Sequence, residues 1–122
     1  MDFKIQYKQF VIIPTKPRMS AGKVASQTAH ATFMALERQR QTKEGRALIA
    51  RWKSEGLCVI VLTCKTQVEL MNIAHYCEQW NVPGHLYIDE GFTEIPMGTA
   101  TAFATGVMPA TQHWMLSQLR LL

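Results

Sequence analysis

Four short apolar runs, separated by segments with helix signals, restrict this 122-residue chain to an α/β fold. The run Leu57–Thr63 is rich in apolar and β-branched residues and is typical of a buried strand. The other runs predict strands at Phe10–Ile13, His85–Asp89 and Thr99–Val107. Because helices between strands make crossovers, we expect a partly parallel sheet. The direct link between the last two strands predicts one antiparallel pairing.

Helix-capping signals stand between these strands. Ser20 and Thr42 have side-chain oxygens that can accept from N–H groups of a first helical turn. Thr66 with Glu69 three residues later forms a capping box. The sequence therefore predicts helices at about 20–40, at about 42–54, from residue 66 onward, and at about 110–119. The predicted order is β-α-α-β-α-β-β-α, a three-layer α/β/α fold with a four-stranded mixed sheet and helices on both faces.

The composition indicates one globular domain over residues 1–122. Apolar residues make up 48% of the chain, which suits a packed core. No apolar run approaches the roughly 18 residues that span a bilayer, so we expect no membrane partner. The first residues lack the apolar core of a secretory signal. The three cysteines form an odd set without a C-x-x-C spacing, which favours reduced thiols in a cytoplasmic protein.

Positive charge is concentrated in the first half of the chain. Residues 1–53 hold eleven Lys or Arg and three acids, whereas residues 54–122 hold two Lys or Arg and six acids. This asymmetry favours a polyanionic partner, nucleic acid above all. The alternative is a solvated basic helix, because six of the basic side chains fall within residues 38–53.

A small-residue loop runs into the first predicted helix, which carries three polar side chains on one face. Gly22 lets a ligand or another backbone come close. Lys23 stands in the first helical turn, where the helix dipole disfavours a cation, and this indicates an anion nearby. Gln27 and His30 follow four and seven residues later and share the same helix face. The alternative is an ordinary amphipathic helix with a polar flank.

A second group of polar residues follows the third predicted strand. Functional groups in α/β sheets gather at the carboxyl ends of strands, which indicates Asp89 and the loop 90–98. If the first and third strands run parallel, the loops after them meet at one edge of the sheet. Asp89, Thr93 and Lys23 can then share a cleft.

These two segments resemble a known family. Residues 22–31, Gly-Lys-Val-Ala-Ser-Gln-Thr-Ala-His-Ala, are similar to the G-K-x-A-x-Q-x-x-H-A signature of type 2 peptidyl-tRNA hydrolases. Residues 89–95, followed by Gly98 and Thr99, resemble the family's D-A-G-x-T-Q loop and its G-S/T ending. Residues 106–109 resemble its closing strand and G-P. The resemblance covers about residues 9–122, with the order and spacing of elements kept.

The resemblance implies hydrolysis of the ester between a peptide and the 3′-terminal ribose of tRNA, with release of free tRNA and with no metal or organic cofactor. It implies that Lys23, Asp89 and Thr93 are the catalytic residues. Ester hydrolysis needs a positioned water, a base near it and a donor for the developing oxyanion. Our hypothesis is that Asp89 orients or deprotonates water, that Lys23 stabilises negative charge or holds a phosphate, and that Thr93 hydrogen-bonds the ester or the water. The resemblance also favours a homodimer. The substrate-binding residues that it implies are Ser20, Gly22, Gln27, His30, Gly91 and Thr99.

The chain departs from the family's pattern in four places. Residues 14–17 are Pro-Thr-Lys-Pro where the family has an Arg-x-Asp-Leu run. Phe92 replaces a basic residue, Glu94 replaces a glutamine and Glu90 replaces a small residue. The loop changes remove positive charge and add negative charge, which weakens contacts with RNA phosphates. The alternative function is an inactive relative that keeps the fold and binds RNA, a nucleotide or a protein.

Other candidate residues have simpler explanations. His30 could act as a base, but a hydrogen-bonded helix histidine is the commoner role. His75 and Cys77 lack a paired metal-ligand spacing, and buried thiols behave as small hydrophobes. The three tryptophans can stack on bases or cover the core. The apolar residues from Trp114 to Leu122 favour either a homodimer contact or docking onto the sheet.

Overall fold

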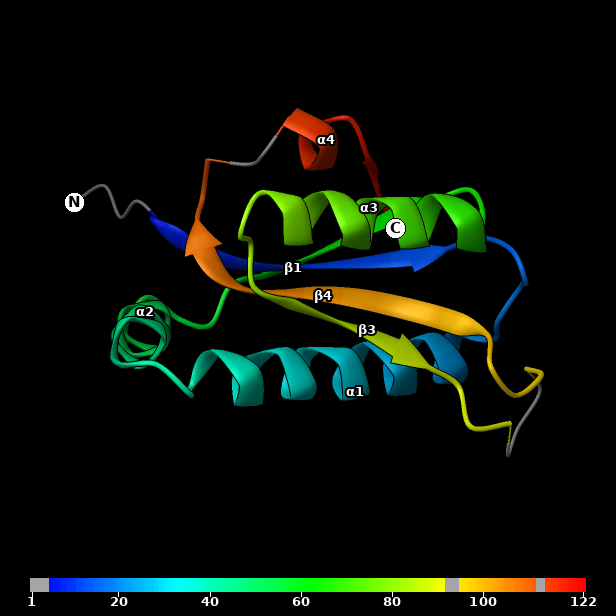
Figure 1. The fold of residues 1–122 in the computed structure, drawn as a ribbon, viewed down its shortest axis with the longest axis horizontal. Coiled ribbons are helices and arrows are strands. Elements are labelled where there is room, and N and C mark those ends of the chain that lie inside the picture. The colour runs from blue at the N-terminus through cyan, green and yellow to red at the C-terminus, as the bar shows by residue number, and fades with distance from the viewer. Residues whose placement is uncertain (1–4, 92–94, 112–113) are drawn as a thin grey trace.

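The computed structural model describes residues 5–91, 95–111 and 114–122. The elements are β1 (Tyr7–Pro14), α1 (Ala21–Gln39), α2 (Lys43–Ser54), β2 (Val59–Cys64), α3 (Gln67–Gln79), β3 (Gly84–Ile88), β4 (Ala100–Pro109), α4 (Trp114–Ser117) and β5 (Arg120–Leu121). The described strands form one sheet in the order β3-β4-β1-β2-β5. Helices α1 and α2 cover one face of this sheet, and α3 and α4 lie on the other (Figure 1). The predicted α/β fold with helices on both faces is confirmed.

The strand directions bring two separate loops to one end of the sheet. β1 is parallel to β2 and antiparallel to β4, and β3 is also antiparallel to β4. Two antiparallel steps give β1 and β3 the same direction, so their carboxyl ends lie at the same end of the sheet. The expectation that the loops after these strands meet is therefore confirmed, as is the antiparallel pairing of the last two predicted strands.

The predicted caps define where three helices begin. The side chains of Ser20, Thr42 and Thr66 each accept a hydrogen bond from the backbone N–H three residues later. Each of these bonds satisfies a donor that the first helical turn leaves open. The cap at Ser20 fixes the start of α1 and so places Lys23 in its first turn.

The end of the chain differs from the prediction. The expected helix over 110–119 is reduced to α4, and the next residues form β5, which pairs antiparallel with β2. The sheet therefore has five strands among the described residues, and the prediction of four was wrong. Leu122 N donates to Val61 O at 3.0 Å, which extends this pairing. Backbone groups of an edge strand need partners, and the tail supplies them to β2.

Side-chain size brings α1 close to the sheet. The α1 side of the core contains Ala31 and Ala35 from the helix against Ala102 and Ala104 from β4. Larger side chains, among them Phe103, occupy the opposite side of the sheet, under α3. Small residues at a helix–sheet contact allow the backbones to approach, so the polar face of α1 lies directly beside β3 and β4.

Gln39 joins the end of α1 to β4. Its side-chain oxygen accepts from Val107 N at 2.7 Å, and its amide donates to Val107 O at 2.8 Å. We expect Gln39→Leu to lower the free energy of unfolding by about 2–4 kcal/mol, because both backbone groups of Val107 would stay buried without a partner. Denaturant unfolding measures this loss.

Gln41→Leu is the matched control. Gln41 is exposed, and its side-chain amide donates to Glu37 O on the helix surface. The control should change the free energy of unfolding by less than about 0.5 kcal/mol. Equal unfolding free energies for the two variants would contradict the role given to Gln39.

Candidate active site

A buried ion pair joins the first turn of α1 to the residue that follows β3. Lys23 Nζ lies 2.6 Å from Asp89 Oδ1, and the two side chains are 9% and 4% exposed. Charged groups are expensive to bury without partners, so the position of each depends on the other. The pair connects segments 66 residues apart in the sequence, at the end of the sheet where β1 and β3 terminate.

Three donors hold the carboxylate of Asp89, two from α1 and one from the residues that follow β3. Besides Lys23, Gln27 Nε2 donates to Oδ1 at 3.1 Å, and Gly91 N donates to Oδ2 at 2.8 Å. Gln27 Nε2 also donates to Thr101 Oγ1 at 2.6 Å. Gly91 has a φ of +83°, and a Cβ there would lie 2.7 Å from Met97 Cβ. A residue with a side chain would therefore displace the N–H that reaches Asp89.

The backbone of Asp89 is fixed as firmly as its side chain. Asp89 N donates to Thr99 O at 2.8 Å, and Gly98 N donates to Asp89 O at 2.9 Å. These two bonds close the base of the loop between β3 and β4. Thr99, which is 9% exposed, therefore positions Asp89 through its main chain.

These contacts keep Asp89 ionised. The hydrogen bond from Lys23 is the largest influence that holds the pKa of Asp89 below its ordinary value. Burial acts in the opposite direction, and the Gly91 N–H, the charge of Lys23 and the Gln27 amide lower the pKa further. A carboxylate with a low pKa accepts a proton poorly, so Asp89 is better suited to orienting groups than to removing a proton completely.

A pocket of about 490 Å³ opens beside this ion pair. Its lining residues are Lys23, Ser26, Gln27, His30, Tyr87, Asp89 and Glu90. The rings of His30 and Tyr87 stack with their centroids 4.8 Å apart and an angle of 11° between their planes. The pocket thus combines an ammonium, a carboxylate and an aromatic wall. This combination can stabilise developing negative charge and can stack a flat ring.

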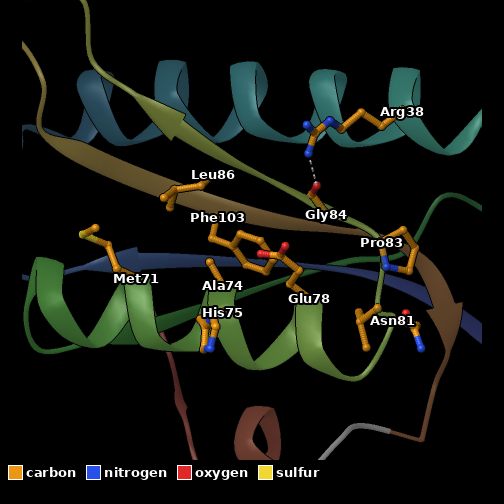
Figure 2. Close-up of a pocket in the computed structure, with 11 residues that line it drawn as sticks. Arg38, Met71, Ala74, His75, Glu78, Asn81, Pro83, Gly84, Leu86 and Phe103 are labelled. Carbon is orange, nitrogen blue, oxygen red and sulfur yellow. Dashed lines mark hydrogen bonds between the residues drawn. The ribbon is translucent and has the colours of Figure 1, made fainter.

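A larger hollow of about 650 Å³ lies between β3 and α3, with Arg38 from α1 at its border (Figure 2). Phe103, Leu86 and Ala74 supply apolar surface there, and Arg38 Nη1 donates to Gly84 O at 3.0 Å. The ionisable side chains of its lining are exposed to solvent. It holds no buried charge pair, so the smaller pocket is the candidate for chemistry.

The thiols and the metal-ligating residue types give no second site in the described part of the chain. Burial raises the pKa of Cys64 to about 12 and that of Cys77 to about 11, so both remain protonated thiols. No three His, Cys, Asp or Glu side chains among the described residues come together as metal ligands. No described helix is long and apolar enough to cross a membrane.

The sequence matches a known protein family over nearly its whole length. The sequence model of the family described as peptidyl-tRNA hydrolase PTH2 matches residues 7–122. The chain belongs to the type 2 peptidyl-tRNA hydrolase family. The matched region of this family member includes every residue that lines the smaller pocket.

Relatives in the family are similar over most of the chain. A probable peptidyl-tRNA hydrolase 2 from Dictyostelium discoideum is 31% identical over 115 residues, which cover 88% of this chain and 54% of that protein. A peptidyl-tRNA hydrolase from Methanopyrus kandleri is 35% identical over 100 residues, 82% of this chain and 84% of that one. A peptidyl-tRNA hydrolase from Thermococcus onnurineus is 35% identical over 105 residues, 85% and 86% of the two chains. The chain thus spans about half the length of the Dictyostelium relative.

The structure brings together four of the residues that the resemblance implied for this family's site. Lys23, Gln27 and His30 lie on one face of α1, as their spacing predicted, and they line the pocket with Asp89. His30 stacks on Tyr87 and is exposed. The spacing of polar residues along one helix was therefore sufficient to find one side of the pocket.

The other predicted residues lie around this group. Gly91 and Thr99 contact Asp89 through their main chains. Ser20 caps α1, and at Gly22 a Cβ would meet no atom within 4 Å; neither residue is part of the pocket lining. Thr93 lies outside the described residues, as do two of the predicted departures, at positions 92 and 94.

Sequence reasoning missed three residues that this family member places at the site. Tyr87 precedes Asp89 by two residues and so points to the same side of the chain. Ser26 follows Lys23 by one helical turn. Thr101, fully buried, accepts from Gln27 and stands two residues after Thr99 in β4. The same periodicities that identified their neighbours could have found all three.

Proposed function

We propose that this chain hydrolyses the ester between the peptide and the 3′-terminal ribose of peptidyl-tRNA, and that the pocket at Lys23 and Asp89 is its active site. Membership of the family and the names of the relatives support the reaction. The observation that carries the choice of site is the buried ion pair, with its two charged atoms 2.6 Å apart at the wall of an open pocket.

In the proposed mechanism, Lys23 stabilises the negative charge that develops on the carbonyl oxygen of the ester. An ammonium has three N–H donors, and Asp89 is the one partner of Lys23 Nζ among the described side chains. A second N–H can therefore donate to the carbonyl oxygen as it becomes negative. A donor of this kind contributes a factor of about 10²–10³ in rate.

Asp89 fixes the ammonium and orients the attacking water. Water attacks the carbonyl carbon, and the bond between that carbon and the ribose oxygen breaks. The ribose oxygen leaves with a proton derived from the water, so the products are the free peptide and tRNA with a free hydroxyl. We assign to Thr93 a hydrogen bond to the ester or to the water.

The remaining residues hold the substrate. The stacked rings of His30 and Tyr87 form a flat wall on which the terminal base of the tRNA can stack. Gln27 is 1% exposed and holds Asp89 in place, so its contribution is positioning. We propose that the loop into α1 guides the ester toward Lys23. We also assign substrate binding to Ser20, Gly22, Gly91 and Thr99, together with the rings of His30 and Tyr87.

The decisive test is the release of peptide from a defined peptidyl-tRNA by the purified chain. We expect multiple turnovers without an added metal or cofactor. Release of the intact peptide together with free tRNA would support ester hydrolysis. An intact ester after prolonged incubation, with RNA still bound, would instead favour an inactive relative that binds RNA.

We further propose that residues 1–122 form one domain that acts as a homodimer in the cytoplasm. Leu121, Leu122 and Trp114 are 71%, 60% and 58% exposed, and such exposed apolar side chains near the end of the chain favour a dimer contact. The described cysteines are free thiols, and the proposed substrate, peptidyl-tRNA, takes part in translation; both support a cytoplasmic location. Sedimentation at micromolar concentration should show a dimer, and Leu121→Ser with Leu122→Ser should shift it to monomer.

A further inference from the structure

Positive charge is concentrated at the far end of α1 from the pocket. Residues 38–53 hold six Lys or Arg and one acid, a net charge of +5, whereas the whole protein carries +4. The rest of the chain is therefore slightly negative. We define the basic α2 face as Lys43, Arg46, Arg51 and Lys53, all of which are exposed.

The basic α2 face is not neutralised by the protein itself. Within the described residues, none of its four side chains forms an ion pair. Arg46 donates to a backbone carbonyl, and Arg51 contacts the side chains of Gln6 and Tyr7. Lys43 and Lys53 are left to solvent. The opposite side of α2 packs into the core through Ile49 and Trp52, so the helix presents its charges outward.

The pocket itself offers little attraction to a polyanion. Its one ammonium, that of Lys23, is paired with Asp89, and Glu90 adds a negative charge to the lining. Affinity for nucleic acid comes mainly from phosphate contacts with Lys and Arg. A protein that binds RNA at this pocket therefore needs a phosphate-binding surface elsewhere.

The spacing between the two regions matches the form of the substrate. α1 has 19 residues, and at a rise of 1.5 Å per residue it is about 28 Å long. Lys23 stands at its first turn, and α2 lies beside its last turn (Figure 1). The 3′ end of a tRNA is a short single strand that continues into a double-helical stem. When the ester lies in the pocket, the stem is therefore separated from the pocket by the length of this single strand.

We propose that the basic α2 face binds the phosphate backbone of the double-helical stem next to the 3′ end, while α1 spans the single strand. This proposal rests on the proposed function and adds the part of the substrate that α2 contacts. The contacts are with phosphates, so they carry no sequence preference. They raise affinity and leave the chemical step to the pocket.

The test compares two double variants with the same change in net charge. Lys43→Gln with Lys53→Gln removes two cations from the basic α2 face. Lys65→Gln with Arg120→Gln removes two exposed cations near the other edge of the sheet, beside the β2–β5 pairing. The full-length proteins are assayed with a peptidyl-tRNA and with the same peptide esterified to adenosine alone.

We expect the α2 variant to lower the ratio of kcat/KM for peptidyl-tRNA to kcat/KM for the adenosine ester by about tenfold, through KM. The plot of log affinity against log salt should become less steep by about 1.5, at 0.7–0.9 per lost phosphate contact. The control variant should keep the wild-type ratio and slope. An unchanged ratio in the α2 variant, or an equal fall in the control, would overturn the proposal.

A binding measurement separates this proposal from the proposed function. Fluorescence anisotropy with an unacylated RNA hairpin that has a single-stranded 3′ tail requires no hydrolysis. Weaker binding by the α2 variant supports the surface even if the wild type cleaves neither ester, in which case only the proposed function fails. If the wild type and the α2 variant bind the hairpin equally, the RNA proposal is refuted. A protein would then be the partner to test for the basic α2 face.

Discussion

Asp89→Asn should lower kcat for peptidyl-tRNA hydrolysis by about 10²–10³-fold, with a much smaller change in KM. The side chain of Asp89 faces three donors, from Lys23, Gln27 and Gly91. An asparagine keeps the shape but has one acceptor oxygen, so its NH₂ group must face one of these donors. The ammonium then loses its fixed position at the ester, and the water loses its acceptor.

The measurement is single-turnover release of peptide, which separates the chemical step from binding. Glu78→Gln is the matched control, because Glu78 is exposed on α3 and lines the other hollow. Both variants should unfold cooperatively in denaturant, which shows that they are folded. Rates for Asp89→Asn within about threefold of wild type would remove this carboxylate from the mechanism.

Lys23→Met should lower kcat/KM by a similar factor, about 10²–10³, and should also change the pH dependence of the reaction. The hydrogen bond from Lys23 is the largest influence that lowers the pKa of Asp89, and burial opposes it. Without the ammonium, burial dominates and the pKa of Asp89 rises. The acidic limb of the pH profile of kcat/KM should therefore move to higher pH.

The same linkage predicts how stability changes with pH. In the wild type, the lowered pKa of Asp89 means that its ionised form stabilises the folded state above the ordinary carboxyl pKa. This contribution is lost as pH falls through the folded-state value. Lys23→Met should thus cost more unfolding free energy at neutral pH than at a pH below the ordinary carboxyl pKa, and denaturant unfolding at the two pH values measures the difference.

Lys65→Met is the control for both measurements, because Lys65 is exposed, is not part of the pocket lining and forms no ion pair within the described residues. It should leave the pH profile and the pH dependence of stability as in the wild type. An acidic limb that stays in place in Lys23→Met would show that the titration of Asp89 does not govern the reaction.

Local signals were sufficient to predict the parts of the site that depend on neighbouring residues. The capping residue Ser20 set the start of α1, and the spacing of Lys23, Gln27 and His30 placed them on one face. The carboxyl-end rule for α/β sheets indicated Asp89. Each of these inferences needed only a local rule: a capping preference, the side-chain periodicity of a helix, or the direction of a strand.

Contacts between segments that are distant in the sequence could not be predicted from local sequence signals. Nothing in residues 114–122 distinguishes a longer helix from a short helix followed by a strand, because the difference lies in the open edge of β2. In the same way, the partnership of Gln27 with Thr101 depends on the packing of α1 over β4. Such pairings follow from the tertiary fold, so the sequence pattern of one segment cannot specify them.

The two main-chain bonds between Asp89 and the pair Gly98 and Thr99 act as a clasp on the intervening segment. Since the clasp uses backbone groups alone, it does not depend on the side chain of Glu90, the residue that follows Asp89. The charge at Glu90, which lines the pocket, can therefore change without moving the anchored carboxylate. The charge that an approaching substrate meets and the position of the carboxylate can thus evolve separately at this position.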